Sequence, residues 1–322
     1  MTATAGPLFL GVDIGGTKTL AVVATSTGTI VGRAIRDTNA SRPVEAIVTT
    51  MTDTARDAIT NAGVDPSKIL AAGIAAAGAV RPIDGLLVWA PQMQTMRNTP
   101  IVSLFQQHWD IPTIVGNDAN LAALAEQRYG AGQGNSNVLF ITVSTGIGGG
   151  IVLNGEIYTG AAGFAGEIGH MTVDAHGPLG RSTTPGAWES FCSGIALVRI
   201  ATERIAAGER SSLEPVVRNG KIDARHIFNA MRTNDPLAIS IVRDASEYMG
   251  VALTSVVNVL NPGIIVIGGG LSSEWDAYIA PAIATMRKIS FAGAGVTTPI
   301  VPPMLGIDAG ALGAITLATS LV

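Results

Sequence analysis

The sequence predicts an α/β fold built from two related lobes. Short apolar runs, typical of buried strands, alternate along the 322 residues with longer segments of helical periodicity. An apolar strand, a Thr/Gly loop, a second apolar strand, a tight turn and a third strand begin near residue 9, and the same order returns near residue 138. Hydrophobic residues make up 47% of the chain and charged residues 14%, which is enough apolar material for sizeable cores.

The composition also limits the partners. Lys and Arg total 20 against 24 Asp and Glu, and no basic run occurs, so we expect no nucleic acid partner. The most apolar run, Ile69–Val80, is too short to span a bilayer, and Met1–Pro7 lacks the features of a signal peptide. The single cysteine, Cys192, cannot form an intramolecular disulfide and is more typical of a buried small hydrophobe than of a catalytic thiol. We therefore expect a cytoplasmic protein with no membrane association.

The first block begins as an antiparallel meander. Its predicted strands are Phe9–Asp13, Leu20–Thr25 and Thr29–Ala34, separated by glycine-containing turns. A helix is predicted over Pro43–Ala62, with Pro43 suited to the first turn and Gly63 just past the end.

Further strands and a helix complete this block before the pattern restarts. Strands are predicted at Ile69–Ala75 and Ile111–Val115, followed by a helix over Ala119–Tyr129. The second block is predicted as strands Val138–Ser144 and Gly150–Leu153, which are joined by a glycine loop at 146–150 and followed by a hairpin turn at Asn154-Gly155.

The rest of the chain is predicted to be mainly helical. The expected helices cover 186–207, 224–231, 236–260 and 309–318, and a short buried strand is expected at Gly263–Ile267.

The segment Asp13–Lys18 has the chemistry of a phosphate-binding turn. Gly15 and Gly16 allow close backbone approach and an anion cradle of N–H groups, while Thr17 adds a hydroxyl and Lys18 a cation. Asp13 is suited to hold a hydrated magnesium ion. A glycine-rich hairpin without a ligand is the alternative, and no helix follows the glycines as a P-loop or dinucleotide motif requires.

A second turn of the same design, Ser144–Gly150, strengthens this interpretation. Its candidate phosphate-binding residues are Thr145, Gly146 and Gly148. A third cluster, Gly268-Gly269-Gly270, stands at a strand end, where ligands of α/β sheets gather. A plain strand-to-helix connection is an equally good explanation of the third cluster.

Polar residues suited to sugar chemistry occur in two places. Asn117 and Asp118 follow a predicted strand and open a helix, so each is either an N-cap or, for Asp118, a base that takes a proton from a hydroxyl. Glu167, His170 and Glu189 offer the acceptors and donors that sugar hydroxyls require. A structural histidine is the alternative at His170, and the set is a poor match to a structural zinc site.

Taken together, these segments resemble the ROK family of repressors, open reading frames and sugar kinases, within the actin/hexokinase superfamily. The resemblance runs from Phe9 to about Ala318 and includes both phosphate loops, 117–120, the diagnostic stretch 166–171, 266–270 and 306–313. It implies a two-lobed actin/hexokinase-like ATPase fold with duplicated ribonuclease-H-like domains. We expect a small lobe of residues 1–116 and 306–322 and a large lobe of residues 117–305.

The resemblance also implies roles. Asp118 is similar in position to the catalytic base of the family, and Gly268–Gly270 would lie by the adenosine of ATP. The sugar ligands implied are Asn98, Asn117, Glu167, His170 and Glu189. The implied cofactors are ATP and Mg²⁺, the implied partner is a hexose, and the family analogy suggests a homodimer.

One stretch departs from the family pattern. The family usually carries a zinc motif, C-x-C-G-x-x-G-C-x-E, and the aligned residues here are 180–189. The three cysteine positions hold Gly180, Ser182 and Ala187, whereas the glutamate is kept as Glu189. We therefore expect no structural zinc, and Trp188 is a candidate for holding this loop by packing. In the family the metal fixes the ring of the histidine that corresponds to His170.

The expected reaction is transfer of the γ-phosphoryl group of Mg-ATP to a hexose hydroxyl, with O6 of glucose as first choice. N-acetylmannosamine, N-acetylglucosamine, fructose and allose are alternative substrates, and a non-catalytic sugar or nucleotide sensor is an alternative function. We expect no repressor activity, because family repressors carry a DNA-binding segment ahead of the first phosphate loop and eight residues precede Phe9.

Overall fold

The computed structural model describes residues 6–179 and 183–322. The chain forms two compact units. The first comprises the described part of Met1–Phe140 with Gly150–Gly166 and Pro303–Val322, and the second comprises Ile141–Gly149 and Glu167–Pro302. The lobe boundary expected from the sequence, between residues 116 and 117, stays a prediction.

The first unit is built on a mixed sheet of order β3-β2-β1-β4-β7. Its strands are β1 (Leu8–Ile14), β2 (Lys18–Thr25), β3 (Ile30–Asp37), β4 (Ile69–Ala76) and β7 (Thr113–Asn117). β1, β2 and β3 pair antiparallel, which confirms the predicted meander, and β4 and β7 continue parallel to β1. The carboxyl ends of β1, β4 and β7 therefore lie at one edge of the sheet.

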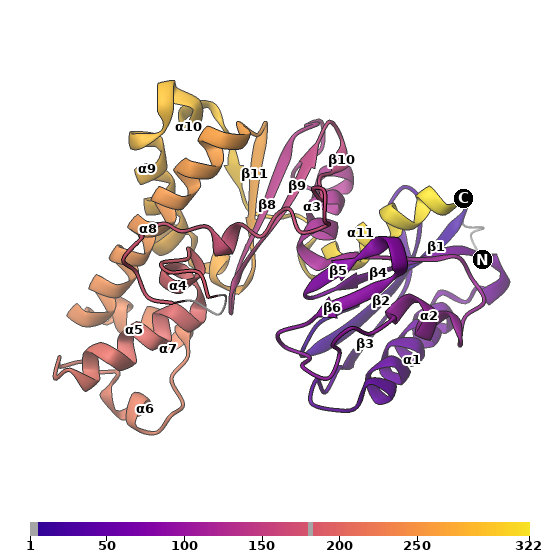
Figure 1. Ribbon diagram of the computed structural model, residues 1–322, viewed down its shortest axis with the longest axis horizontal. Helices are drawn as coiled ribbons and strands as arrows, with labels where there is room; N and C mark the ends of the chain where they lie inside the picture. Colours follow the sequence, from indigo (N-terminus) through magenta and orange to yellow (C-terminus); the bar gives the residue numbers. More distant parts are fainter. Residues whose placement is uncertain (1–5, 180–182) are drawn as a thin grey trace. The chain divides into compact units, whose positions relative to one another are not determined.

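Helices cover both faces of this sheet (Figure 1). The alternate residues Leu8, Leu10, Val12 and Ile14 pack in one core with α1 (Val44–Ala62). The opposite face packs against α11 (Ala309–Ala318) and α3 (Asp118–Tyr129).

Helix α11 touches the backbone of its neighbours at glycines. A Cβ on Gly11 would lie 2.1 Å from the carbonyl oxygen of Ala311, and one on Gly73 would lie 1.9 Å from that of Ala314. Gly313 approaches the backbone of Leu121 on α3 in the same way. Three glycines thus let α11 lie directly on β1, β4 and α3, with no side chain between them.

The buried carboxylate of Glu126 on α3 holds the segment that leads into α11. Its oxygens accept hydrogen bonds from the backbone N–H groups of Met304, Leu305 and Ala131 at 2.8–3.2 Å. These charge-assisted bonds satisfy a buried anion and tie residues 303–305 to the first unit.

The second sheet has the order β10-β9-β8-β11-β12. Its strands are β8 (Val138–Val143), β9 (Ile147–Leu153), β10 (Glu156–Ile157), β11 (Ile264–Gly268) and β12 (Ile300–Val301). The order repeats that of the first sheet, with the third, second and first strands of a meander followed by two later strands. The sequence repeat is therefore confirmed as a structural repeat, as is the Asn154-Gly155 turn, where both residues have positive φ.

The predicted glycine loop at 146–150 is wrong in its extent. The turn closes at Ser144–Gly146, where the Ser144 N–H donates to the Gly146 carbonyl, and β9 already begins at Ile147. Gly150 lies within this strand. It is a glycine because the Ala119 carbonyl approaches it so closely that a Cβ would lie 2.3 Å from that oxygen. This glycine serves close packing rather than a loop.

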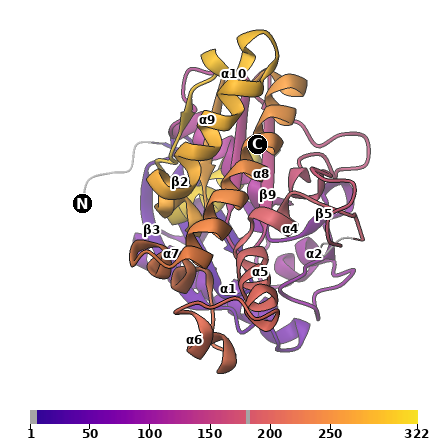
Figure 2. The same ribbon diagram turned by 90° about the vertical axis from the view of Figure 1, so that its left-hand side faces the viewer.

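The second unit is mainly helical, and α8 (Pro236–Leu260) is its longest helix, as predicted (Figure 2). The helices α4, α5, α7 and α9 pack around it. The helices of this unit are α4 (Glu189–Cys192), α5 (Gly194–Ala206), α6 (Glu214–Arg218), α7 (Ala224–Arg232), α8, α9 (Ala280–Ile289) and α10 (Ala294–Thr297).

The single helix predicted over 186–207 is wrong, because the chain breaks it. Gly186 has a φ of 57°, which no helix allows, and Ser193 is extended between α4 and α5. The Ser193 hydroxyl accepts a hydrogen bond from the Ala196 N–H and so caps α5.

Short elements complete the described chain. They are β5 (Ala79–Arg81), β6 (Leu86–Trp89), α2 (Ile101–Gln106) and the single turns η1 (Pro66–Lys68), η2 (Pro82–Asp84), η3 (Ile168–His170), η4 (Gly270–Glu274), η5 (Trp275–Ile279), η6 (Phe291–Gly293), η7 (Gly306–Asp308) and η8 (Thr319–Leu321). None of the helices in the described ranges combines the length and apolar character needed to cross a membrane.

Candidate active site

Two carboxylates meet at the carboxyl edge of the first sheet. Asp13 is the penultimate residue of β1, and Asp118 begins α3 directly after β7. The register Ile14↔Ala76↔Asn117 brings the ends of the two strands to the same level with only β4 between them. Burial, together with the negative charge of Asp118, raises the pKa of Asp13 to about 7. Two carboxylates placed in this way are well suited to bind a cation, because its positive charge would offset the repulsion between them.

Helix α11 shapes the space around Asp13. Gly310 lies against its carboxylate, and a Cβ at position 310 would lie 2.3 Å from Oδ2. Only glycine at this position leaves the carboxylate its place.

The structure shows which of the two residues, Asn117 or Asp118, caps α3. Asn117 is the N-cap of α3, because its Oδ1 accepts a hydrogen bond from the Asn120 N–H at 3.0 Å. Its Nδ2 donates to the Gly78 carbonyl at 3.0 Å and to Asp118 Oδ1 at 3.1 Å. Asp118 is therefore the first helical residue, with its carboxylate held by the amide of the capping residue.

The first phosphate loop forms a tight turn between β1 and β2. The Gly15 N–H donates to the Lys18 carbonyl at 3.0 Å, so this N–H closes the turn, and both Thr17 and Lys18 are exposed. Gly16 lies against Gln92, whose Cβ would be 2.6 Å from a Cβ at position 16. Gln92 was missed by sequence reasoning, since it lies in an irregular segment with no periodicity or motif.

Asn98 also belongs to the first unit. It is exposed, its φ is 49°, and its N–H donates to the Val88 carbonyl. Asparagine tolerates this left-handed conformation better than most residues do. The backbone conformation alone therefore explains an asparagine at position 98, independently of the role expected for it in sugar binding.

The second unit brings Glu167, His170 and Glu189 together, although Glu189 is distant in sequence. His170 Nε2 lies 3.7 Å from Glu167 Oε2, and His170 Nδ1 lies 3.9 Å from Glu189 Oε1. Burial raises the pKa of Glu167; the charge of His170 lowers it and that of Glu189 raises it further. The Glu189 side chain is about 10% exposed, and its Oε1 has no hydrogen-bond partner among the described residues. A buried acceptor of this kind calls for a donor from a ligand.

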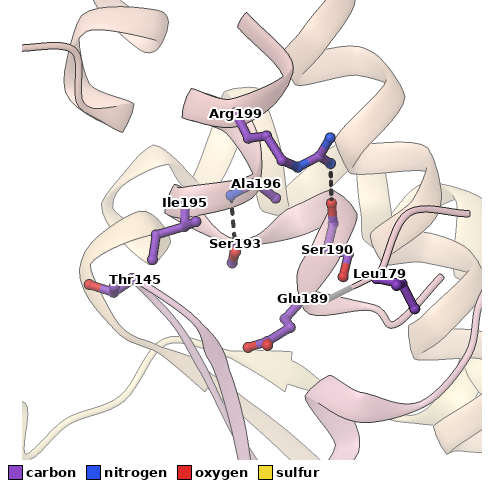
Figure 3. Close-up of a pocket in the computed structure, with 8 residues that line it drawn as sticks. All are labelled: Thr145, Leu179, Glu189, Ser190, Ser193, Ile195, Ala196 and Arg199. Atoms are coloured by element: carbon purple, nitrogen blue, oxygen red, sulfur yellow. Dashed lines mark hydrogen bonds between the residues drawn. The ribbon is translucent and has the colours of Figure 1, made fainter. Parts of the chain in front are cut away.

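A pocket of about 210 Å³ lies beside Glu189 (Figure 3). Thr145 from the second phosphate loop and Glu189 both line it, together with Ser190, Ser193 and Arg199 from α4 and α5. An Arg199 nitrogen donates to the Ser190 carbonyl at 2.9 Å. A residue proposed for phosphate and one proposed for sugar therefore border the same pocket.

The glycines of both loops in the second unit have close contacts of their own. A Cβ on Gly146 would lie 3.0 Å from Glu189 Oε2, whereas Gly148 lies within β9. Gly268 ends β11, and Gly270 begins a single helical turn. Gly269 has a φ of 89°, and a Cβ there would lie 2.5 Å from the Val143 carbonyl. The third glycine cluster is thus a strand-to-helix connection in geometry, and its contact with adenosine stays a prediction.

The stretch that aligns with the zinc motif of the family lies partly outside the described residues, because Gly180 and Ser182 belong to the part that the structure does not describe. Ala187, at the third cysteine position, is fully buried and offers no metal ligand. Sequence reasoning missed Ser190, Ser193 and Arg199, since one continuous helix was expected where Ser193 starts a second one.

Comparison with known proteins identifies the family. The model of the ROK family matches residues 9–320. The chain is 35% identical over 314 residues to a glucokinase of Halalkalibacterium halodurans, covering 95% of this chain and 93% of that protein. It is similar to a ROK hexokinase of Thermus thermophilus, with a TM-score of 0.82, 30% identity and 98% of each chain covered.

A second solved structure is similar over nearly the whole chain. It is a ROK family glucokinase of Streptomyces griseus in complex with glucose and AMPPNP, with a TM-score of 0.80 and 33% identity. The likeness covers 97% of this chain and 99% of that one. With both sheets, the repeat and the diagnostic residues in place, this chain belongs to the ROK family.

Proposed function

We propose that this protein is an ATP-dependent hexose kinase that transfers the γ-phosphoryl group of Mg-ATP to O6 of glucose. The observation that carries the proposal is the carboxylate pair of Asp13 and Asp118 at the carboxyl edge of the first sheet, where burial and, to a smaller extent, the charge of Asp118 raise the pKa of Asp13. The likeness to glucokinases, one of them in complex with glucose and AMPPNP, supports the choice of substrates.

Asp118 is the proposed catalytic base. It would accept the proton of the sugar hydroxyl as that oxygen attacks the γ-phosphorus and the bond from phosphorus to the bridging oxygen of ADP breaks. The Asn117 amide and the start of α3 hold this carboxylate in place at the carboxyl edge of the sheet. Phosphoryl transfer passes through a loose transition state, so orientation of the hydroxyl is the larger part of the task.

The residues around Asp13 fit a magnesium ion that arrives with ATP. Magnesium is commonly held by one or two carboxylates together with substrate phosphates, and a cation here would relieve the repulsion between Asp13 and Asp118. When bound, the ion would neutralise charge on the phosphates. Thr17 and Lys18 in one loop and Thr145 and Gly146 in the other are the proposed phosphate ligands, as Gly268–Gly270 is for adenosine.

The proposed sugar ligands are Asn98, Asn117, Glu167, His170 and Glu189. The best supported is Glu189, because its buried Oε1 lacks a hydrogen-bond partner among the described residues and a sugar hydroxyl would supply the donor. We further propose, from the family resemblance, that the protein acts in the cytoplasm as a homodimer.

A panel of sugars tests the proposal. The purified protein is incubated with Mg-ATP and glucose, N-acetylmannosamine, N-acetylglucosamine, fructose or allose, and ADP release is measured against a sugar-free control. We expect the largest kcat/KM with glucose and formation of glucose 6-phosphate. A larger kcat/KM with another hexose would show that this hexose, and not glucose, is the substrate. If none of the sugars raises ADP release above the sugar-free control, the proposal that the protein is a hexose kinase is wrong.

A further inference from the structure

The segment that links His170 to Glu189 does not fit the zinc site that the family resemblance implies. Structural zinc sites are built from cysteine and histidine ligands. The one cysteine of the chain, Cys192, donates its thiol hydrogen to the Ala245 carbonyl, and burial raises the pKa of the thiol well above its usual range. Within residues 6–179 and 183–322, no group of three or more His, Cys, Asp or Glu side chains could hold a metal ion. Another device must therefore hold this segment.

An aromatic stack packs against the segment between His170 and Glu189. The ring of Phe191 on α4 lies on the ring of Tyr248 on α8, with 4.0 Å between ring centroids and 17° between ring planes. The same Phe191 ring touches the chain at Gly177, where a Cβ would lie 2.5 Å from Cζ. The Tyr248 hydroxyl lies 3.5 Å from Asp174 Oδ2. The stack thus contacts the segment through Gly177 and Asp174.

Backbone hydrogen bonds connect the part of the segment beside the stack to His170. The Trp188 N–H donates to the Met171 carbonyl, and the Val173 N–H donates to the Gly186 carbonyl, each at 2.8 Å. Gly186 must be glycine, since its φ is 57° and a Cβ would lie 1.6 Å from the Asp174 carbonyl oxygen. The residues that follow His170 are therefore paired with those that precede Glu189.

Glu189 depends on this frame for its orientation. It is the first residue of α4, two positions before Phe191, and its Oε1 has no hydrogen-bond partner among the described residues. The direction of its carboxylate into the pocket is set by the placement of α4 (Figure 3). Trp188, fully buried, anchors the preceding position, and its carbonyl accepts hydrogen bonds from the Phe191 and Cys192 N–H groups.

We propose that the stack of Phe191 on Tyr248 takes over in this chain the positioning task that zinc performs in relatives with the cysteine motif, and thereby holds Glu189 and His170 for the sugar. The proposal rests on the proposed function as a hexose kinase. Phe191 and Tyr248 are positioning residues, because they act on the sugar only through Glu189 and His170.

The test separates loss of positioning from loss of stability. Tyr248→Leu removes the ring, Tyr248→Phe keeps the ring and removes the hydroxyl, and Phe228→Leu is the control. Phe228 is an aromatic residue of the same unit, 1% exposed, that packs edge-on to Tyr278 with 5.6 Å between ring centroids and is not a member of the stack. For each variant we would measure the melting temperature and the KM values for glucose and for Mg-ATP.

Tyr248→Leu should raise KM for glucose about tenfold while KM for Mg-ATP changes less than twofold. Tyr248→Phe should stay close to the wild type in KM for glucose, which shows rescue by the ring alone. Phe228→Leu should lower the melting temperature without changing KM for glucose. If Tyr248→Leu only lowers the melting temperature and leaves KM for glucose as in the wild type, the stack has no positioning role and the proposal is wrong.

Two further measurements make the outcome independent of turnover. Elemental analysis of the wild-type protein should find no stoichiometric zinc; one zinc per chain would overturn the proposal. Hydrogen exchange without ligands should show faster exchange over residues 171–179 and 183–189 in Tyr248→Leu than in Phe228→Leu. If the wild type phosphorylates no hexose, the proposed function fails, and equal exchange in these two variants would then refute the stack separately.

Discussion

Replacing Asp13 by asparagine should stabilise the ligand-free protein while abolishing phosphoryl transfer. In the native state the pKa of Asp13 is about 7, against 3.8 for an ordinary aspartate. Between these two values the native state keeps a proton that the unfolded chain has released. Raising the pH through this window therefore lowers the free energy of unfolding of the wild type. Asparagine has the same shape and does not titrate, so the variant escapes this loss.

The magnitude follows from the width of the window. Each unit of pKa difference corresponds to about 1.36 kcal/mol, and about two units lie between pH 5 and pH 7, which gives an upper limit of about 2.7 kcal/mol. Asp13 retains some solvent exposure, so we expect about half of this, roughly 1–2 kcal/mol, from solvent screening. For a protein of this size that corresponds to about 2–8 °C in melting temperature.

The assay is thermal unfolding at pH 5, 6, 7 and 8 in EDTA and without nucleotide, so that no cation occupies the carboxylate pair. The difference in melting temperature between Asp13→Asn and the wild type should grow from pH 5 to pH 7 and then level off. The control is Asp110→Asn, which removes the same charge at an exposed position of the same unit. A difference that is constant from pH 5 to pH 8, or one that Asp110→Asn reproduces, would refute the reasoning.

Three further predictions concern the same site. Asp118→Asn should lower kcat by about two to four orders of magnitude with an unchanged melting temperature, because it removes the base and keeps the shape; near-normal turnover would rule out this role. Gly310→Ala should lower both the melting temperature and kcat, since a Cβ would lie 2.3 Å from Asp13 Oδ2; a kcat equal to that of the wild type would contradict this steric argument. Saturating glucose without ATP should slow hydrogen exchange over residues 166–179 and 183–189, and unchanged exchange would contradict the assignment of Glu189 and His170 to the sugar.

The elements that sequence reasoning predicted well are those in which one physical rule dominates. Helix α8 was predicted with its observed bounds because its apolar residues keep a helical period over 25 residues, and the structure adds that the Asp235 side chain caps it. The meander was predicted because its first two strands are largely apolar and glycine-containing turns separate the strands. In both cases local preference and tertiary packing agree.

Prediction failed where the identity of a residue is explained by a tertiary contact and not by the local conformation of the chain. The glycines of 148–150 suggested a loop, yet Gly150 is glycine because the Ala119 carbonyl lies against it in a strand. Ser193 interrupts an otherwise helical pattern by capping α5, and a serine alone in such a pattern does not announce a break. Gln92 fills the space above Gly16 from a segment without periodicity. Such contacts come from the folded chain and leave no local signal.

The candidate site was partly predictable for the same reason. Asp13, Asp118 and the group of Glu167, His170 and Glu189 could be named from residue type and position. Their electrostatics could not, since the pKa of Asp13 depends on burial and on Asp118, which is more than a hundred positions away in sequence. That Glu189 Oε1 has no hydrogen-bond partner within the described part of the chain likewise became apparent only from the packing around α4.

The glycine contacts of α11 fix the interval between the two carboxylates through main-chain atoms alone. The helix touches β1, which carries Asp13, through Gly11, and it touches α3, which begins with Asp118, through Gly313. No rotamer intervenes at either contact, so repacking of side chains elsewhere in the core has little leverage on the distance from Asp13 to Asp118. Substitutions elsewhere in the core can then alter stability while the spacing of Asp13 and Asp118 stays constant. Replacement of Gly11 or Gly313 by a larger residue, in contrast, would change this spacing abruptly.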